Sequence, residues 1–177
     1  MILIFKNNIM EFNMYALIAA SFCTLIIGAI WYNPKVFGRL WMHASGLTED
    51  KLRGGNIFVT FLLVLIFGFF MAFILQFLVI HQFGVFGAIG GDPLVAKPSY
   101  QAFMDDYGTT FRTFKHGALH GFMTGLLFTF SLIVINALFE RKSWKYILIN
   151  SGYWLITLTI MGGIICGWYK ANLFYFS

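Results

Sequence analysis

The sequence predicts an all-α membrane protein whose four transmembrane helices form two hairpins. Of its 177 residues, 59% are hydrophobic and only 11% are charged, whereas a soluble domain carries roughly 25% charged residues. A chain of this size cannot bury so much apolar surface inside one small globule, so lipid has to solvate part of it. Four apolar runs are each long enough to cross the hydrocarbon core of a bilayer as a helix.

These runs define the expected spans within a single domain over residues 1–177. The first three contain no Asp, Glu, Lys or Arg, and the fourth carries only Lys145, next to its first residue. Main-chain polar groups cannot be left unpaired in lipid, which favours helices for all four. The expected spans are residues 14–32, 57–80, 117–139 and 144–168.

Lysine and arginine are concentrated in the two short loops that follow the first and third spans. These loops and their borders hold seven of the 12 cationic residues, although the segments on the other side of the membrane are longer. Cationic loops favour the cytoplasmic side of a membrane. We therefore expect a protein of the bacterial cytoplasmic (inner) membrane, with both termini and the long loop 81–116 facing outward.

The stretch "IWYNPKVFGRLWM" ends the first span and continues beyond it. It contains aromatic rings, a proline and two cations. Trp and Tyr rings favour the headgroup level of a bilayer. We expect Asn33 to be an N-cap and Pro34 to begin a short amphipathic helix that Gly46 ends. Such a helix lies in the membrane surface as an anchor, or serves as a platform that recognises a lipid headgroup or docks a partner. The interface residues are expected to be Trp31, Tyr32, Lys35, Arg39, Trp41 and His43.

The long loop 81–116 contains a further expected helix, from a cap at Ser99 to Tyr107, with Gly108 as its stop. Apolar residues recur along it at positions i, i+3, i+4 and i+7, which is the spacing of one helix face. This face needs a covering surface, and we expect it to lie on the membrane, to cap the bundle, or to act as a lid or docking site. Its residues are Tyr100, Phe103, Met104 and Tyr107.

Small residues recur every four positions in the third span, so they line one face along which a second helix backbone can approach closely. The partner of this face can be the fourth span, which carries two glycines, the first span, or a second copy of the chain. Asn136 and Asn150 are expected at similar depths in the neighbouring third and fourth spans, and we expect their amides to pair. The expected glycine packing positions are Gly117, Gly121, Gly125, Gly163 and Gly167.

His116 and His120 are four residues apart at the outer end of the third span. Two histidines at this spacing hold a metal ion when a third ligand reaches them, and Asp105 or Asp106 in the preceding loop is the candidate for that ligand. Two histidines and a loop carboxylate fall short of a metal motif. We therefore expect no metal or other cofactor, and assign the pair to structural hydrogen bonding or interfacial placement.

Three segments carry a family resemblance: "IGAIWYNPKVFGRLWM", "GLTEDKL" and "LFERKSWKYILINSGYWLITLTIMGGIICGW". They resemble the bacterial and fungal membrane family known as domain of unknown function 1761. The resemblance covers the first, third and fourth spans and both basic loops. It implies a small integral membrane protein with four helices, and it implies no activity, because the family has none assigned.

The chain contains no catalytic motif such as G-x-S-x-G or H-E-x-x-H, so we name no catalytic residue and favour a non-enzymatic role. The expected function is that of a structural or accessory subunit that contacts membrane lipids and a second copy or another membrane protein. Nucleic acid is not an expected partner, because the cations lie at the membrane edge. Two alternatives stay open: an oligomeric carrier of small molecules or lipids, and a metal-dependent lipid-modifying enzyme using His116, His120 and Asp105 or Asp106.

Overall fold

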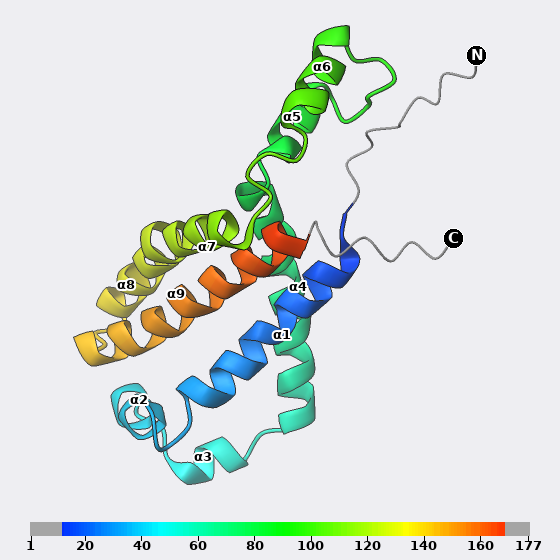
Figure 1. Ribbon diagram of the computed structural model, residues 1–177. Helices are drawn as coiled ribbons and strands as arrows, with labels where there is room; N and C mark the ends of the chain where they lie inside the picture. Colours follow the sequence, from blue (N-terminus) through cyan, green and yellow to red (C-terminus); the bar gives the residue numbers. More distant parts are fainter. Residues whose placement is uncertain (1–11, 169–177) are drawn as a thin grey trace.

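The computed structural model describes residues 12–168 of the chain. Within this range the chain is helical, and the described residues contain no strand (Figure 1). Four helical stretches are long and apolar enough to cross a membrane, which confirms the predicted fold class. They are α1 (Met14–Trp31), α4 (Ile57–Val79), the continuous stretch Phe114–Phe139 and α9 (Trp144–Gly167).

Each span begins at a polar side chain that accepts hydrogen bonds from the main chain of the first helical turn, as N-cap residues do. Thr113 is the N-cap of the third span, and its Oγ1 accepts a hydrogen bond from the N–H of His116 at 3.2 Å. This cap starts the span at Phe114, a little before the predicted start at Gly117. The other three N-caps are Asn13, Asn56 and Ser143.

Helix α9 lies at the centre of the bundle, packed against α1, α4 and the third span (Figure 1). Of its most apolar window, 50% is buried, against 11% for α4 and 11% for the third span. These two spans therefore turn most of their apolar side chains away from the bundle, which suits helices that are solvated by lipid.

Glycines bring the third span into close contact with α9. Its first part, α7 (Phe114–Met123), carries Gly117 and Gly121. A Cβ atom on either would collide with a main-chain carbonyl of α9, that of Gly162 for Gly117 and that of Leu158 for Gly121. Small residues at this spacing allow two helices to approach closely in a membrane. The glycine face of the third span thus lies against α9.

The other expected glycine packing positions lie on the same interface, which we call the glycine seam. A Cβ atom on Gly125 would lie 3.0 Å from Cα of Leu155, and one on Gly167 would lie 2.9 Å from the main-chain nitrogen of Phe114. The ring of Phe114 also fills the space in front of Gly163. The start of the third span and the end of α9 are therefore fitted together around Phe114.

A π-helix, η1 (Thr124–Thr129), interrupts the third span between α7 and α8 (Phe130–Phe139). A π-turn takes about one residue more than an α-turn, and that residue rotates the positions after it by roughly 100° relative to a regular α-helix. Asn136 lies beyond this point and is exposed. The helix face on which Asn136 lies therefore cannot be counted along the sequence as if the span were regular.

The aromatic pair at the end of α1 bonds to α9. Trp31 Nε1 donates a hydrogen bond to the carbonyl of Ile149 at 2.9 Å, and the Tyr32 hydroxyl donates one to Asn150 Oδ1 at 3.1 Å. Asn150 Nδ2 in turn donates to the carbonyl of Tyr146 at 2.8 Å. The Asn150 amide thus has partners in α1 and α9, whereas the sequence paired it with Asn136. Both aromatic rings are half-buried.

The predicted surface helix begins further along the chain than expected, because a turn follows α1. Asn33 Oδ1 accepts a hydrogen bond from the N–H of Lys35 at 2.9 Å, and the Asn33 carbonyl accepts one from Gly38 at 2.9 Å. These bonds fold the chain into turns where the sequence predicted a helix starting at Pro34. Helix α2 (Gly38–Ser45) follows and ends at Gly46, whose φ is 71°. The short α3 (Glu49–Arg53) completes the loop before α4.

At the opposite end of the bundle, α5 (Gln82–Ala88) and α6 (Pro98–Tyr107) project beyond α4 (Figure 1). Helix α6 stops before Gly108, as predicted, but it begins at Pro98 with Lys97 as N-cap instead of a cap at Ser99. Proline suits the first helical position because its missing N–H would be unpaired there in any case. Of the predicted apolar stripe, Tyr100 and Met104 are buried, and Phe103 and Tyr107 are exposed.

A candidate metal site at the ends of the second and third spans

Three of the four histidines of the chain converge where the last turn of α4 meets the first turns of α7. They are His81, His116 and His120, and their ring nitrogens that could bind a metal ion all lie within 4.8 Å of one another. We call these three residues the histidine cluster. In the described part of the chain, this is the group of side chains whose geometry is closest to that of a metal site.

Local structure places each ring. Helix α4 ends at Val79, and His81 follows in the turn that begins α5. Thr113 fixes the first turn of α7, so His116 and His120 project from successive turns of one helix face, four residues apart. Because α4 and α7 pack against each other, the turn after one helix meets the first turns of the other.

The three rings form a nearly equilateral triangle. Their centroids are 4.8 Å apart for His81 and His116, 4.9 Å for His81 and His120, and 4.5 Å for His116 and His120. Nε2 of His116 lies 2.9 Å from Nε2 of His81. Two imidazole nitrogens on one tetrahedral zinc ion are about 3.3 Å apart, given Zn–N bonds of about 2.0–2.1 Å. The ligand nitrogens of the cluster lie within 4.8 Å of one another, which is near this spacing, and the 2.9 Å contact is also a hydrogen-bond distance between the two rings.

Phe111 packs beside the cluster in a strained main-chain conformation. Its ring stacks on the His116 ring, with centroids 5.0 Å apart and planes inclined by 23°. Its φ is 62°, which is unusual for a bulky residue that is not glycine. Its carbonyl accepts hydrogen bonds from the N–H of Thr113 at 2.8 Å and from Cys166 Sγ at 3.3 Å. Strain of this kind persists only where the surroundings fix the residue, and it occurs preferentially at functional sites.

The sequence named two of the three histidines and missed the third. Asp105 and Asp106, the predicted source of a third ligand, lie on α6 and do not belong to the cluster. Asp105 Oδ1 accepts a hydrogen bond from Gln101 Nε2 at 2.7 Å. A signal for His81 was available, because the end of the second span and the start of the third lie on the same side of the membrane.

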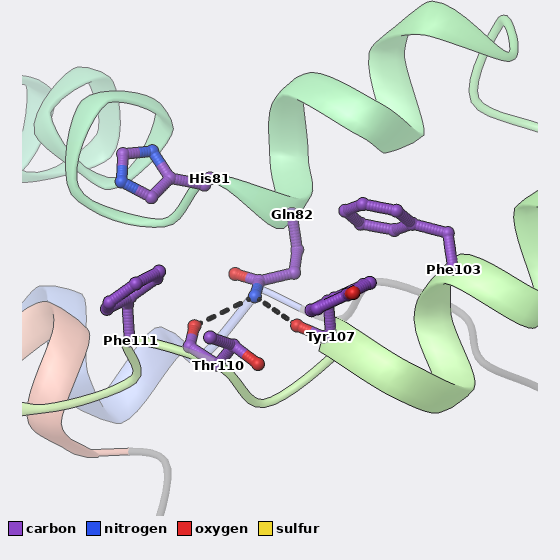
Figure 2. A pocket seen from close by; sticks show the side chains of 6 residues that line it. All are labelled: His81, Gln82, Phe103, Tyr107, Thr110 and Phe111. Carbon is purple, nitrogen blue, oxygen red and sulfur yellow. Dashed lines mark hydrogen bonds between the residues drawn. The ribbon is translucent and has the colours of Figure 1, made fainter.

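A pocket adjoins the cluster and shares His81 with it, and Phe111, whose ring stacks on His116, also lines this pocket. Figure 2 shows the Gln82 amide reaching toward the loop that precedes α7. Gln82 Nε2 donates hydrogen bonds to the carbonyls of Tyr107 at 2.8 Å and Thr110 at 3.0 Å. Gln82 Oε1 is buried and has no hydrogen-bond partner among the described residues. The lining consists of His81, Gln82, Phe103, Tyr107, Thr110 and Phe111.

Comparison with known proteins identifies a family to which the chain is similar. The model of a family described as "Protein of unknown function (DUF1761)" matches residues 15–166, which include all four spans except the first residue of α1 and the last of α9. No curated protein and no solved structure matches the chain. The matched range contains the whole histidine cluster and the whole pocket.

Proposed function

This chain belongs to the DUF1761 family, and from that premise we propose that it is a membrane protein that binds a divalent transition-metal ion through His81, His116 and His120. One observation carries the proposal: three imidazoles from two separate segments converge so that their ligand nitrogens lie within 4.8 Å of one another. A structural role for a single histidine needs one hydrogen-bond partner and does not require three rings to face a common point.

The donor set indicates the class of ion. Imidazole nitrogen suits zinc, copper, nickel and iron, whereas calcium and magnesium prefer oxygen ligands. Three protein ligands leave the fourth position of a tetrahedral ion open to water or to another molecule, which is the arrangement of catalytic zinc sites. Zinc is therefore the ion that we propose for this site.

The charge distribution along the chain supports the proposal that the cluster faces the outer side of the membrane. The cationic loops lie at the other end of the bundle, with α2 and α3, and positive loops favour the cytoplasm. In a bacterium the cluster would then meet metal ions from outside the cytoplasmic membrane. An ion bound there would join the end of α4 to the start of α7 and so tie the first hairpin to the second.

Metal titration of the purified protein tests this function. The full chain is purified in mild detergent with an affinity tag that contains no histidine, stripped with a chelator, and titrated with Zn²⁺ by calorimetry. We expect one ion per chain. Replacing His81, His116 or His120 singly by Ala should weaken binding at least about tenfold, since each replacement removes one of three ligands.

The fourth histidine provides the matched control. His43 is exposed on α2, at the opposite end of the bundle, so His43→Ala should bind Zn²⁺ as the unchanged protein does. Binding that is substoichiometric, or that survives in the variant with all three cluster histidines replaced, would contradict the proposal.

A further inference from the structure

We propose that the pocket beside the histidine cluster binds a small apolar molecule that carries one hydrogen-bond donor, and that Gln82 Oε1 is the acceptor for this donor. The inference does not depend on the metal ion. It rests on the lining of the pocket and on a buried acceptor that the described part of the chain leaves without a donor.

The orientation of the Gln82 amide is fixed by its surroundings. Nε2 donates to two main-chain carbonyls, those of Tyr107 and Thr110, at 2.8 and 3.0 Å. Turning the amide over would set Oε1 against both carbonyl oxygens, and none of these three atoms can donate. The oxygen therefore faces away from the loop, toward the side where Figure 2 shows His81 and Phe111.

A buried acceptor without a donor is unfavourable, because it has lost its hydrogen bonds to water and gained none from the protein. Gln82 is only 4% exposed. A single water is a poor remedy in this place, since a buried water needs two to four polar partners and the lining of the pocket is almost entirely apolar. A ligand with one hydrogen-bond donor and an apolar body pairs with Gln82 Oε1 and also suits the apolar lining.

The walls define the class of ligand. Phe103, Tyr107 and Phe111 present three aromatic rings to a space of small size, which suits a ring or a short chain in contact with their faces. A carboxylate or phosphate is disfavoured, because it would set a further acceptor against Gln82 Oε1. An alcohol, a phenol or an N–H heterocycle fits. Phe111 is the most exposed of the three rings.

The test compares two probes that differ in one donor. 4-Fluorophenol carries a hydroxyl group, and 4-fluoroanisole carries a methoxy group on the same ring. Both are titrated by ¹⁹F NMR against the full-length protein in detergent, with empty micelles as the blank and a chelator present, so that phenol bound to metal cannot imitate the result. We expect saturable binding of 4-fluorophenol, at least about tenfold tighter than that of 4-fluoroanisole, which is the factor for about 1.4 kcal/mol.

Two variants locate the site. Phe103→Ala removes a wall and should weaken both probes, whereas Phe139→Ala removes a ring that is 86% exposed at the far end of the third span and should affect neither. Gln82→Met removes the acceptor and should abolish the preference for the phenol. If Gln82→Met does not fold, the two probes and the Phe103→Ala variant still decide the question.

Several results would overturn the proposal. Equal affinities for the two probes would show that Gln82 Oε1 accepts nothing from the ligand. Equal effects of Phe103→Ala and Phe139→Ala would show that the probes partition into the micelle or onto the apolar surface. A crystal structure in which an ordered water on Gln82 Oε1 stays in place at saturating 4-fluorophenol would assign the acceptor to water.

Discussion

Nε2 of His116 lies 2.9 Å from Nε2 of His81, a residue 35 positions earlier in the chain. Between them run α5, α6 and the loop that carries Phe111. A ligand that binds both rings therefore closes this long segment into a ring and stabilises the folded state relative to the unfolded chain.

Zn²⁺ should raise the thermal stability of the purified protein. At a free concentration of 100 times the dissociation constant, binding to the folded state alone contributes about 2.7 kcal/mol, which corresponds to an increase of about 5–10 °C in Tm for a chain of this size. Differential scanning fluorimetry in detergent measures the shift. His120→Ala should remove most of it and His43→Ala none of it. An equal shift in all three proteins would mean that the ion acts elsewhere.

Gly121→Ala should destabilise the protein strongly, because its new Cβ atom would collide with the carbonyl of Leu158 in α9. Overpacking costs about 1–3 kcal/mol, and a main-chain atom cannot move aside as a side chain does. Gly87→Ala is the matched control, since a Cβ atom there meets nothing within 4 Å. It should be neutral or slightly stabilising through helix propensity. Unfolding in detergent distinguishes the two, and equal stabilities would place the glycine seam in lipid.

Tyr32→Phe and Tyr153→Phe should each lower the free energy of unfolding by about 0.6–1.7 kcal/mol, the range for hydrogen bonds between membrane helices. The first loses the bond to Asn150, and the second loses the bond from its hydroxyl to the carbonyl of Thr24 at 2.9 Å. Tyr15→Phe is the control, because Tyr15 is 79% exposed. If all three variants unfold at the same denaturant concentration, these bonds do not hold α1 to α9.

Phe111 allows main-chain strain to be separated from ring packing. Phe111→Ala and Phe111→Gly both remove the ring that stacks on His116, but only glycine adopts a φ of 62° without strain. Phe111→Gly should therefore be more stable than Phe111→Ala by about 1–2 kcal/mol. Equal stabilities would indicate that the loop relaxes to a negative φ once the ring is removed.

Cysteine labelling tests the proposed orientation. Cys23 and Cys166 are buried, so they contribute little background. Ser99→Cys on α6 and Lys51→Cys on α3 are both exposed, at opposite ends of the bundle. In intact cells a membrane-impermeant maleimide should label Ser99→Cys and spare Lys51→Cys, and disrupted cells should label both. The reverse pattern would invert the topology and place the histidine cluster in the cytoplasm.

The spans could be predicted because length and hydropathy determine them almost alone. A run such as Ile57–Val79 is long and apolar enough to cross a membrane whatever the rest of the chain contains. Local signals were less reliable. Asn33 and Pro34 carry the ordinary marks of a helix start, yet the Asn33 carbonyl accepts the Gly38 N–H and holds the chain in a turn. Asn and Pro also favour turns, so these residues alone do not distinguish a turn from the start of a helix.

The complete site could not be predicted, because tertiary contacts form it and no local sequence pattern reveals them. His116 and His120 share a helix face and could be paired from their spacing, whereas His81 reaches them through the packing of α4 against α7. The unpaired acceptor on Gln82 depends on where the carbonyls of Tyr107 and Thr110 lie. The π-helix was also invisible, because apolar residues fill all sides of a lipid-exposed span and leave no periodicity to reveal an extra residue.

The π-helix Thr124–Thr129 has a consequence for the evolution of the third span. An extra residue absorbed in one widened turn leaves the helices on both sides packed as they are, with α7 against α9 and the histidines beside α4. Deleting one residue there should restore α-helical turns and keep both flanking faces in place. A deletion between His116 and His120 would instead rotate His116 away from His120 and Gly117 away from the face that Gly121 presents to α9. Related chains should therefore differ in length inside Thr124–Thr129 and not before it.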